Sequence, residues 1–138
     1  MGHALISGRS DDAYICAYPR SGSTWLRTIL VNILDPTAGS NPDVFNARIP
    51  AVSIRNAKRI NGLDSPRLIM THSAWRPAIN KSVYLLRDGR DSFISSYYYH
   101  TARQGTTLDI DQYLDHYLSN EYGVTWAEHT ESWLNYGQ

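Results

Sequence analysis

The sequence predicts an α/β domain in which a mostly parallel sheet lies between layers of helices. Short apolar runs of strand length alternate along the chain with segments of helical periodicity, the pattern that produces strand–helix–strand units. Such connections place the strands parallel and side by side. The chain has 138 residues, of which 42% are hydrophobic, enough for one core, so residues 1–138 are expected to form a single domain.

Composition limits the classes of partner and compartment. Lysine plus arginine and aspartate plus glutamate number 13 each, and the resulting net charge of zero disfavours a nucleic-acid-binding protein. Cys16 is the single cysteine, which leaves no internal disulfide and predicts a buried thiol. No apolar run reaches membrane-spanning length and no signal peptide is recognised, so we expect a cytoplasmic protein that does not bind membranes.

The first predicted strand follows a polar lead-in, residues 1–12, which is expected to contribute little to the core. Residues 14–18 are apolar and predict a buried strand, which ends at Pro19 because proline has no N–H to donate to a sheet. A loop of small residues comes next. From Trp25 onward the apolar side chains recur with helical spacing, which predicts a helix that continues to residue 34.

This strand–loop–helix unit has the geometry in which free backbone N–H groups and a helix N-terminus bind phosphate or sulfate. Arg20 adds a permanent positive charge. The standard P-loop has a lysine directly after its second glycine, whereas Ser23 follows Gly22 here and Ala17 replaces the first glycine. The fold class is therefore a P-loop-like three-layer domain in which phosphate binding is favoured and nucleoside triphosphatase activity is not.

Residues 35–66 are expected to be an irregular loop region. Proline, glycine and polar residues that break secondary structure are dense in residues 35–43. Weak periodicity, together with Pro50 and Pro66, allows no helix or strand to be assigned in the remainder. A long irregular connection of this kind is either a lid or substrate-binding loop, or a surface excursion without a function.

The second half of the chain repeats the alternation of strands and helices. Residues 67–72 and 82–87 are interpreted as buried strands that end in polar side chains. Residues 90–103 carry an apolar stripe and predict a helix. A capping box at residues 109–112 predicts the start of another helix, and a further one can begin at Trp126.

Each of the three predicted strands ends at, or is followed by, a side chain that can bind an anion or transfer a proton. The first is followed by Arg20, the second ends in His72 and the third ends in Arg87. Ligands of open α/β sheets bind at the carboxyl ends of the strands, so these side chains are expected to lie together.

Other aromatic and histidine residues show no pattern of a site. Tyr97, Tyr98 and Tyr99 are interpreted as packing residues. His100, His116 and His129 lack the spacing of metal ligands and are interpreted as surface or interface residues, so no metal site is predicted.

Three motifs occur in order at the strand ends. They are YPRSGSTW at residues 18–25, Thr71-His72, and Arg87 followed eight residues later by Ser95. Together they resemble the 5′-phosphosulfate loop, the K-T-H-x-P segment and the 3′-phosphate motif of sulfotransferases that use 3′-phosphoadenosine-5′-phosphosulfate (PAPS). The segment YGVTWAEHTESW at residues 122–133 is also similar to that family. The resemblance runs from about residue 13 to the end of the chain.

The resemblance implies an enzyme that moves a sulfuryl group from PAPS to a hydroxyl or amine of a small-molecule acceptor, by in-line transfer and without a metal. His72 would be the general base, and Arg20 would stabilise charge on the oxygen that bridges phosphorus and sulfur. The implied PAPS-binding residues are Arg20, Ser21, Gly22, Ser23 and Thr24 around the 5′ end, Trp25 against the adenine, and Arg87 and Ser95 at the 3′-phosphate.

The sequence also departs from the family pattern. Met70 stands where many cytosolic members have a lysine, and the family's R-K-G-x-x-G-D-W region and dimerisation motif have no counterpart before Gln138. The chain therefore resembles the N-terminal part of a sulfotransferase domain. Three explanations are open: the chain is a fragment, a homo-oligomer or a completing partner chain closes the site, or the chain is a reduced form that binds nucleotide weakly.

Two other functions remain open at the level of sequence. One is a nucleotide-binding module that is catalytically incomplete. The other is a kinase-like phosphoryl transferase, which the lack of an evident Mg²⁺-binding carboxylate at a strand end disfavours. Single residues also have ordinary interpretations: His72 as a satisfied polar side chain, Trp25 as a core residue and Arg87 as half of a surface ion pair.

Overall fold

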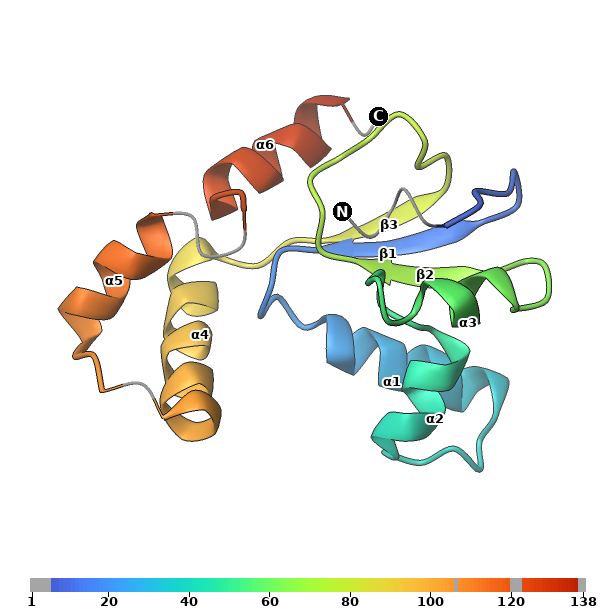
Figure 1. Ribbon diagram of the computed structural model, residues 1–138, viewed down its shortest axis with the longest axis horizontal. Coiled ribbons are helices and arrows are strands. Elements are labelled where there is room, and N and C mark those ends of the chain that lie inside the picture. Colours follow the sequence, from blue (N-terminus) through green and yellow to red (C-terminus); the bar gives the residue numbers. More distant parts are fainter. Residues whose placement is uncertain (1–5, 106, 120–122, 137–138) are drawn as a thin grey trace.

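The computed structural model describes residues 6–105, 107–119 and 123–136 (Figure 1). Within these residues a parallel sheet has three strands in the order β2-β1-β3, where β1 is Ala13–Ala17, β2 is Leu68–Thr71 and β3 is Ser82–Leu85. The central strand pairs on both sides, because Tyr14 is in register with Ile69 of β2 and with Ser82 of β3. The predicted α/β class with a parallel sheet is confirmed.

The side chains of β1 alternate between two cores. Ile15 packs with Val31 of α1 (Ser23–Leu34) and Phe45 of α2 (Pro42–Arg48) on one face. Tyr14 and Cys16 pack on the other face, which α6 (Trp126–Tyr136) covers. In Figure 1, α1 and α2 lie below the strands and α6 lies above them. Helices therefore cover both faces, which is the predicted three-layer arrangement.

Cys16 lies in the middle of the buried strand. Its side chain is fully buried and unpaired with another cysteine. Burial raises the pKa of the thiol to about 12, so the reactive thiolate is scarce at neutral pH. The prediction of a buried thiol is confirmed.

Residues 35–66 contain two short helices, so the expectation of an entirely irregular region was wrong. The side chain of Asn41 caps α2 by accepting from the amide of Asp43 at 2.9 Å, and Pro42 occupies the first turn, where proline is tolerated. Farther along, α3 (Ala57–Asn61) places Ile60 in the core. An asparagine followed by proline can end one element and also start a helix. The sequence analysis interpreted these residues only as breakers of secondary structure and missed the start of the helix.

The lead-in also contributes more to the core than expected. Asp12 is buried and accepts hydrogen bonds from Nε and Nη2 of Arg67 at 2.7 and 2.6 Å. Arg67 is itself fully buried directly before β2, and Ile6 packs against the core cluster that contains Tyr14. A buried ion pair therefore fastens residues 6–12 to the sheet.

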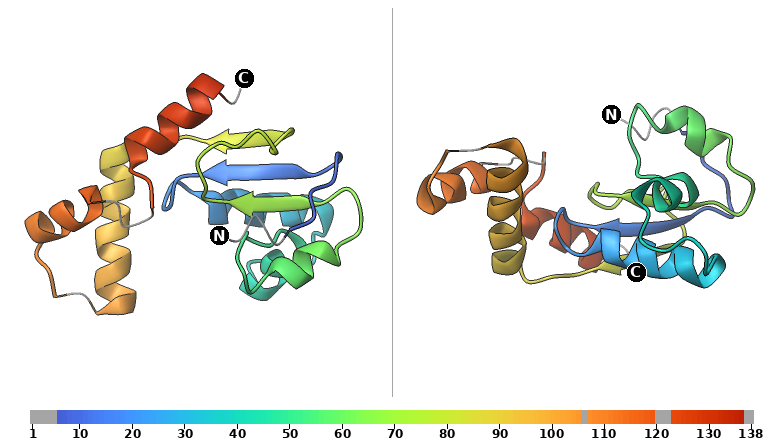
Figure 2. Two further views of the ribbon diagram at one scale, coloured as in Figure 1. Left: turned by 45° about the horizontal axis from the view of Figure 1, so that its top comes forward. Right: turned by 90° about the horizontal axis from the view of Figure 1, so that it is seen from below.

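Two helices extend beyond the carboxyl ends of the strands (Figure 2). They are α4 (Gly89–Gln104) and α5 (Ile110–Leu118), and α5 begins with the predicted capping box of Asp109 and Gln112. Tyr18, directly after β1, packs with Tyr113 and Tyr117 of α5. In the part of the chain that the structure describes, no helix is long and apolar enough to cross a membrane.

Candidate functional site

A cleft of about 580 Å³ opens where the three strands end. This is the edge of the sheet at which the sequence predicted the functional side chains to lie together. The cleft is lined by Pro19, Arg20, Gly22, Ser23, Thr24, Trp25, His72, Arg87, Ser95, Tyr99 and His100. Every site residue predicted from the sequence lies there except Ser21. Ser21 is buried, with its hydroxyl oxygen 3.4 Å from that of Ser92 on α4.

The loop between β1 and α1 turns back tightly. The amide of Ser21 donates to the carbonyl oxygen of Tyr18, and Arg20 and Gly22 have φ values of 66° and 98°. Glycine adopts such values readily, whereas arginine does so where its surroundings impose them. The N-cap residue of α1 is Gly22, which has no side chain that could cap the helix. Its first N–H groups and the positive end of its dipole are therefore available to an anion in the cleft.

Two guanidinium groups reach the cleft, and each donates a hydrogen bond to a neighbouring group. Nη1 of Arg87 donates to the carbonyl oxygen of Arg20 at 2.9 Å, and Nε of Arg20 donates to the hydroxyl of Ser95 at 3.3 Å. The carboxylate of Asp91 lies 3.9 Å from Nε of Arg87, and both side chains are partly or largely exposed, so this ion pair is weak. The positive charge of Arg87 therefore remains available to an anion.

His72 follows β2, and the end of β1 orients its ring. Nδ1 lies 2.7 Å from the carbonyl oxygen of Ala17, which can only accept, so Nδ1 carries the proton and Nε2 is the basic nitrogen of the neutral ring. The surrounding protein lowers the pKa of His72 below 6.5 by desolvating its charged form. The bond to Ala17 opposes this lowering of the pKa, and the buried guanidinium of Arg27 adds to it. The residue still has exposed surface at the cleft, so a substrate can reach it.

Comparison with known proteins places this sequence in a family. A profile of the sulfotransferase domain matches residues 10–138. The chain belongs to the sulfotransferase family. It is 30% identical to Sulfotransferase 1E1 of Rattus norvegicus over 93% of this chain and 50% of the relative. It is 29% identical to Sulfotransferase 1E1 of Homo sapiens over 96% and 51%, and 30% identical to Sulfotransferase 1B1 of Mus musculus over 88% and 47%. The chain thus spans about half the length of the curated relatives it matches.

Trp25 of this sulfotransferase-family chain is not a core residue. It stands in the first turn of α1, lines the cleft, and leaves 80% of its surface exposed. An indole of this size would normally be buried in a helix that packs on a sheet. Its exposure beside the loop between β1 and α1 leaves a large flat face available to a ligand.

The cleft also includes residues that the sequence interpretation assigned elsewhere. Tyr99, interpreted as a packing residue, and His100, interpreted as a surface or interface residue, both line it. Tyr98 is 65% exposed and is not a packing residue either, and His129, expected at the surface, is fully buried. The signal for Tyr99 was present, because a residue four positions after Ser95 lies on the same face of a helix.

Helix α6 holds both strand ends that flank the cleft. The indole N–H of Trp126 donates to the carbonyl oxygen of Arg87 at 3.0 Å, and that of Trp133 donates to the carbonyl oxygen of Ser73 at 3.2 Å. Gly89 lies so close to the Trp126 ring that a Cβ at this position would come within 2.8 Å of it. Neither tryptophan is among the residues that line the cleft. Their effect on the site is to fix the backbone beside its functional side chains.

Proposed function

We propose that this chain binds PAPS in the cleft and transfers its sulfuryl group to a hydroxyl or amine of a small molecule. The observation that carries the proposal is the convergence in one cleft of an uncapped helix N-terminus, two guanidinium groups and an imidazole whose Nε2 is unprotonated. Membership of the sulfotransferase family supports it.

The polar groups of the cleft fit a nucleotide with phosphates at two positions. The loop after β1 and the N-terminus of α1 would hold the 5′-phosphosulfate, because both present N–H groups to an anion. Arg87 and Ser95 would hold the 3′-phosphate, since hydrogen bonds between a guanidinium and a phosphate are strengthened by charge. The exposed ring of Trp25 would stack on the adenine.

The transfer needs a base for the acceptor and positive charge beside the departing oxygen. When bound, PAPS supplies an activated sulfuryl group, whose bond to the bridging phosphate oxygen breaks with both electrons staying on that oxygen. Nε2 of His72 takes the proton of the acceptor hydroxyl or amine as the acceptor atom bonds to sulfur. Arg20 stabilises the charge on the departing oxygen without giving up a proton, because a guanidinium stays protonated.

An assay with PAPS and a panel of phenols, alcohols and amines tests this proposal. We expect acceptor-dependent formation of 3′-phosphoadenosine-5′-phosphate (PAP) without added Mg²⁺, and no phosphoryl transfer from ATP with Mg²⁺. His72→Ala should lower turnover by about 10²- to 10⁴-fold while PAP affinity stays within about two-fold of the parent. His116→Ala is the matched control, since this exposed histidine lies on α5 outside the cleft lining.

The outcomes separate the proposal from its alternatives. Tight PAP binding without turnover on any acceptor would identify a nucleotide-binding module that is catalytically incomplete. Transfer from ATP in place of PAPS would identify a phosphoryl transferase. No PAP binding by calorimetry at millimolar nucleotide would overturn the proposal.

A further inference from the structure

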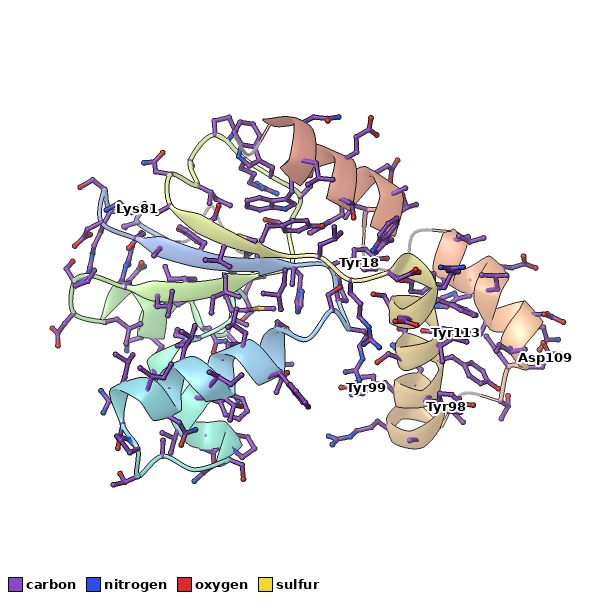
Figure 3. All side chains as sticks on the ribbon, turned by 180° about the vertical axis from the view of Figure 1, so that it is seen from behind. Tyr18, Lys81, Tyr98, Tyr99, Asp109 and Tyr113 are labelled. Atoms are coloured by element: carbon purple, nitrogen blue, oxygen red, sulfur yellow. The ribbon has the colours of Figure 1, made fainter. Side chains whose placement is uncertain are left out.

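Tyr99 contacts the Arg20 side chain in a way that the proposed reaction does not by itself require. Cζ of Arg20 lies 4.3 Å from the centroid of the Tyr99 ring, within the range of a cation–π interaction. Figure 3 shows Tyr99 on the side of α4 that faces α1, away from Tyr113. We propose that Tyr99 is a positioning residue that holds the Arg20 guanidinium in the cleft, ready for the anion.

Arg20 needs such a contact because little else holds its side chain. A long arginine side chain samples many rotamers unless contacts restrict it. Among the described residues, no carboxylate forms an ion pair with Arg20. Its Nε donates to Ser95, which stands one helical turn before Tyr99 on α4. Ser95 and Tyr99 together therefore set the direction of the guanidinium.

The two contacts engage different parts of the guanidinium. Ser95 occupies Nε, and the ring of Tyr99 lies against the central carbon, so the Nη groups remain for the oxygen atoms of an anion. A carboxylate at position 99 would neutralise Arg20 and compete with a bound anion. An aromatic face attracts the cation through its quadrupole and leaves the charge intact. Tyr99 thus orders Arg20 without weakening its attraction for an anion.

The same ring also lies near a second guanidinium. Cζ of Arg103, one turn farther along α4, is 5.8 Å from the ring centroid of Tyr99. Tyr99 therefore has two positive charges near its ring, that of Arg20 in the cleft and that of Arg103 outside the cleft lining. Such a concentration of charge favours a ligand that carries several negative charges, as a nucleotide bisphosphate does.

The contact itself can be tested without any nucleotide. In the NMR spectrum of the full chain, the δ protons of Arg20 should be shifted upfield by the current of the Tyr99 ring. We expect Tyr99→Phe to keep this shift and Tyr99→Leu to abolish it. Tyr98→Leu is the matched control and should leave the shift unchanged, because Tyr98 is exposed on the same helix. Arg20 δ protons at unshifted positions in the parent chain would overturn the proposal, whatever the activity.

The functional effect, which rests on the proposed function, is tested by PAP calorimetry in a double-mutant cycle. Tyr99→Leu should weaken PAP binding by about two- to five-fold, and Tyr99→Phe should recover most of that loss. In an Arg20→Ala background, Tyr99→Leu should cause no further loss. Equal losses in both backgrounds would overturn the positioning role.

Failure of the proposed function would be distinguishable from failure of this inference. If the parent chain binds no PAP, the proposed function is wrong, and the same cycle is run with inorganic sulfate. A Tyr99→Leu effect on sulfate binding that requires Arg20 would still support the positioning role. Sulfate binding that is unaffected by Tyr99→Leu would overturn it.

Discussion

The guanidinium of Arg87 donates to the backbone carbonyl oxygen of Arg20 at 2.9 Å, which joins the end of β3 to the loop after β1. Arg20 has a positive φ, a conformation that a residue other than glycine keeps only when its surroundings over-determine it. The contact with Arg87 is one of those surroundings. Arg87 therefore shapes the loop that would bind one anionic group while its charge faces the place of another.

Replacing Arg87 should consequently weaken nucleotide binding more than the loss of one phosphate contact would. We expect Arg87→Ala to lower PAP affinity by about a hundred-fold or more, because each hydrogen bond to a charged group contributes about 1.5–3 kcal/mol and Arg87 would lose two, one to the phosphate and one to the loop. Calorimetric titration measures the change. Arg90→Ala is the matched control, since Arg90 is exposed and pairs with Asp88. PAP affinity that stays within two-fold in Arg87→Ala would contradict both roles.

The pH dependence of activity should report His72. Desolvation lowers the pKa of this imidazole from its ordinary value of 6.5, so kcat/KM should rise with pH on a limb centred below 6.5. The sign follows from the role of base: protonation at low pH removes the lone pair of Nε2. A pH profile of kcat/KM measures the limb, and its midpoint above pH 6.5 would contradict this assignment. The residual activity of His72→Ala should lack the limb.

Much of the site could be predicted because the ligand-binding side chains of parallel sheets lie at the carboxyl ends of the strands. Arg20, His72 and Arg87 are far apart in sequence, yet each follows a short apolar run, and the structure places all three at one cleft. The position of Tyr99 in the cleft was harder to predict. Three consecutive tyrosines on a helix point in different directions, so residue type alone does not show which of them faces the cleft. One is exposed and another lines the cleft.

The features that the sequence did not reveal depend on tertiary contacts. The carbonyl partners of Trp126 and Trp133 lie 39 and 60 residues away, and nothing in the local pattern of α6 selects them. Asp12 is another case, since a polar residue in a polar lead-in is expected to be solvated. Its burial depends on the guanidinium that β2 brings to it.

The ion pair between Asp12 and Arg67 should contribute strongly to stability. Asp12→Asn would leave a fully buried guanidinium without its counter-charge, and we expect a loss of about 3–5 kcal/mol in the free energy of unfolding. Urea denaturation monitored by tryptophan fluorescence measures the change. Asp11→Asn at the neighbouring position is the control and should alter stability by less than about 0.5 kcal/mol. A similar, small effect of both variants would show that the buried pair is not stabilising.

The two tryptophans of α6 should affect different steps, because each holds a different strand end. Trp133→Phe keeps an aromatic ring but removes the N–H that donates to the carbonyl of Ser73, next to His72, so turnover should fall by about two- to ten-fold with little change in PAP affinity. Trp126→Phe removes the donor to the carbonyl of Arg87, so PAP affinity should fall by a similar factor. Measuring kcat and the Kd for PAP in both variants tests this division. If each variant changes kcat and Kd to the same extent, α6 acts on the fold as a whole and does not hold the two strand ends separately.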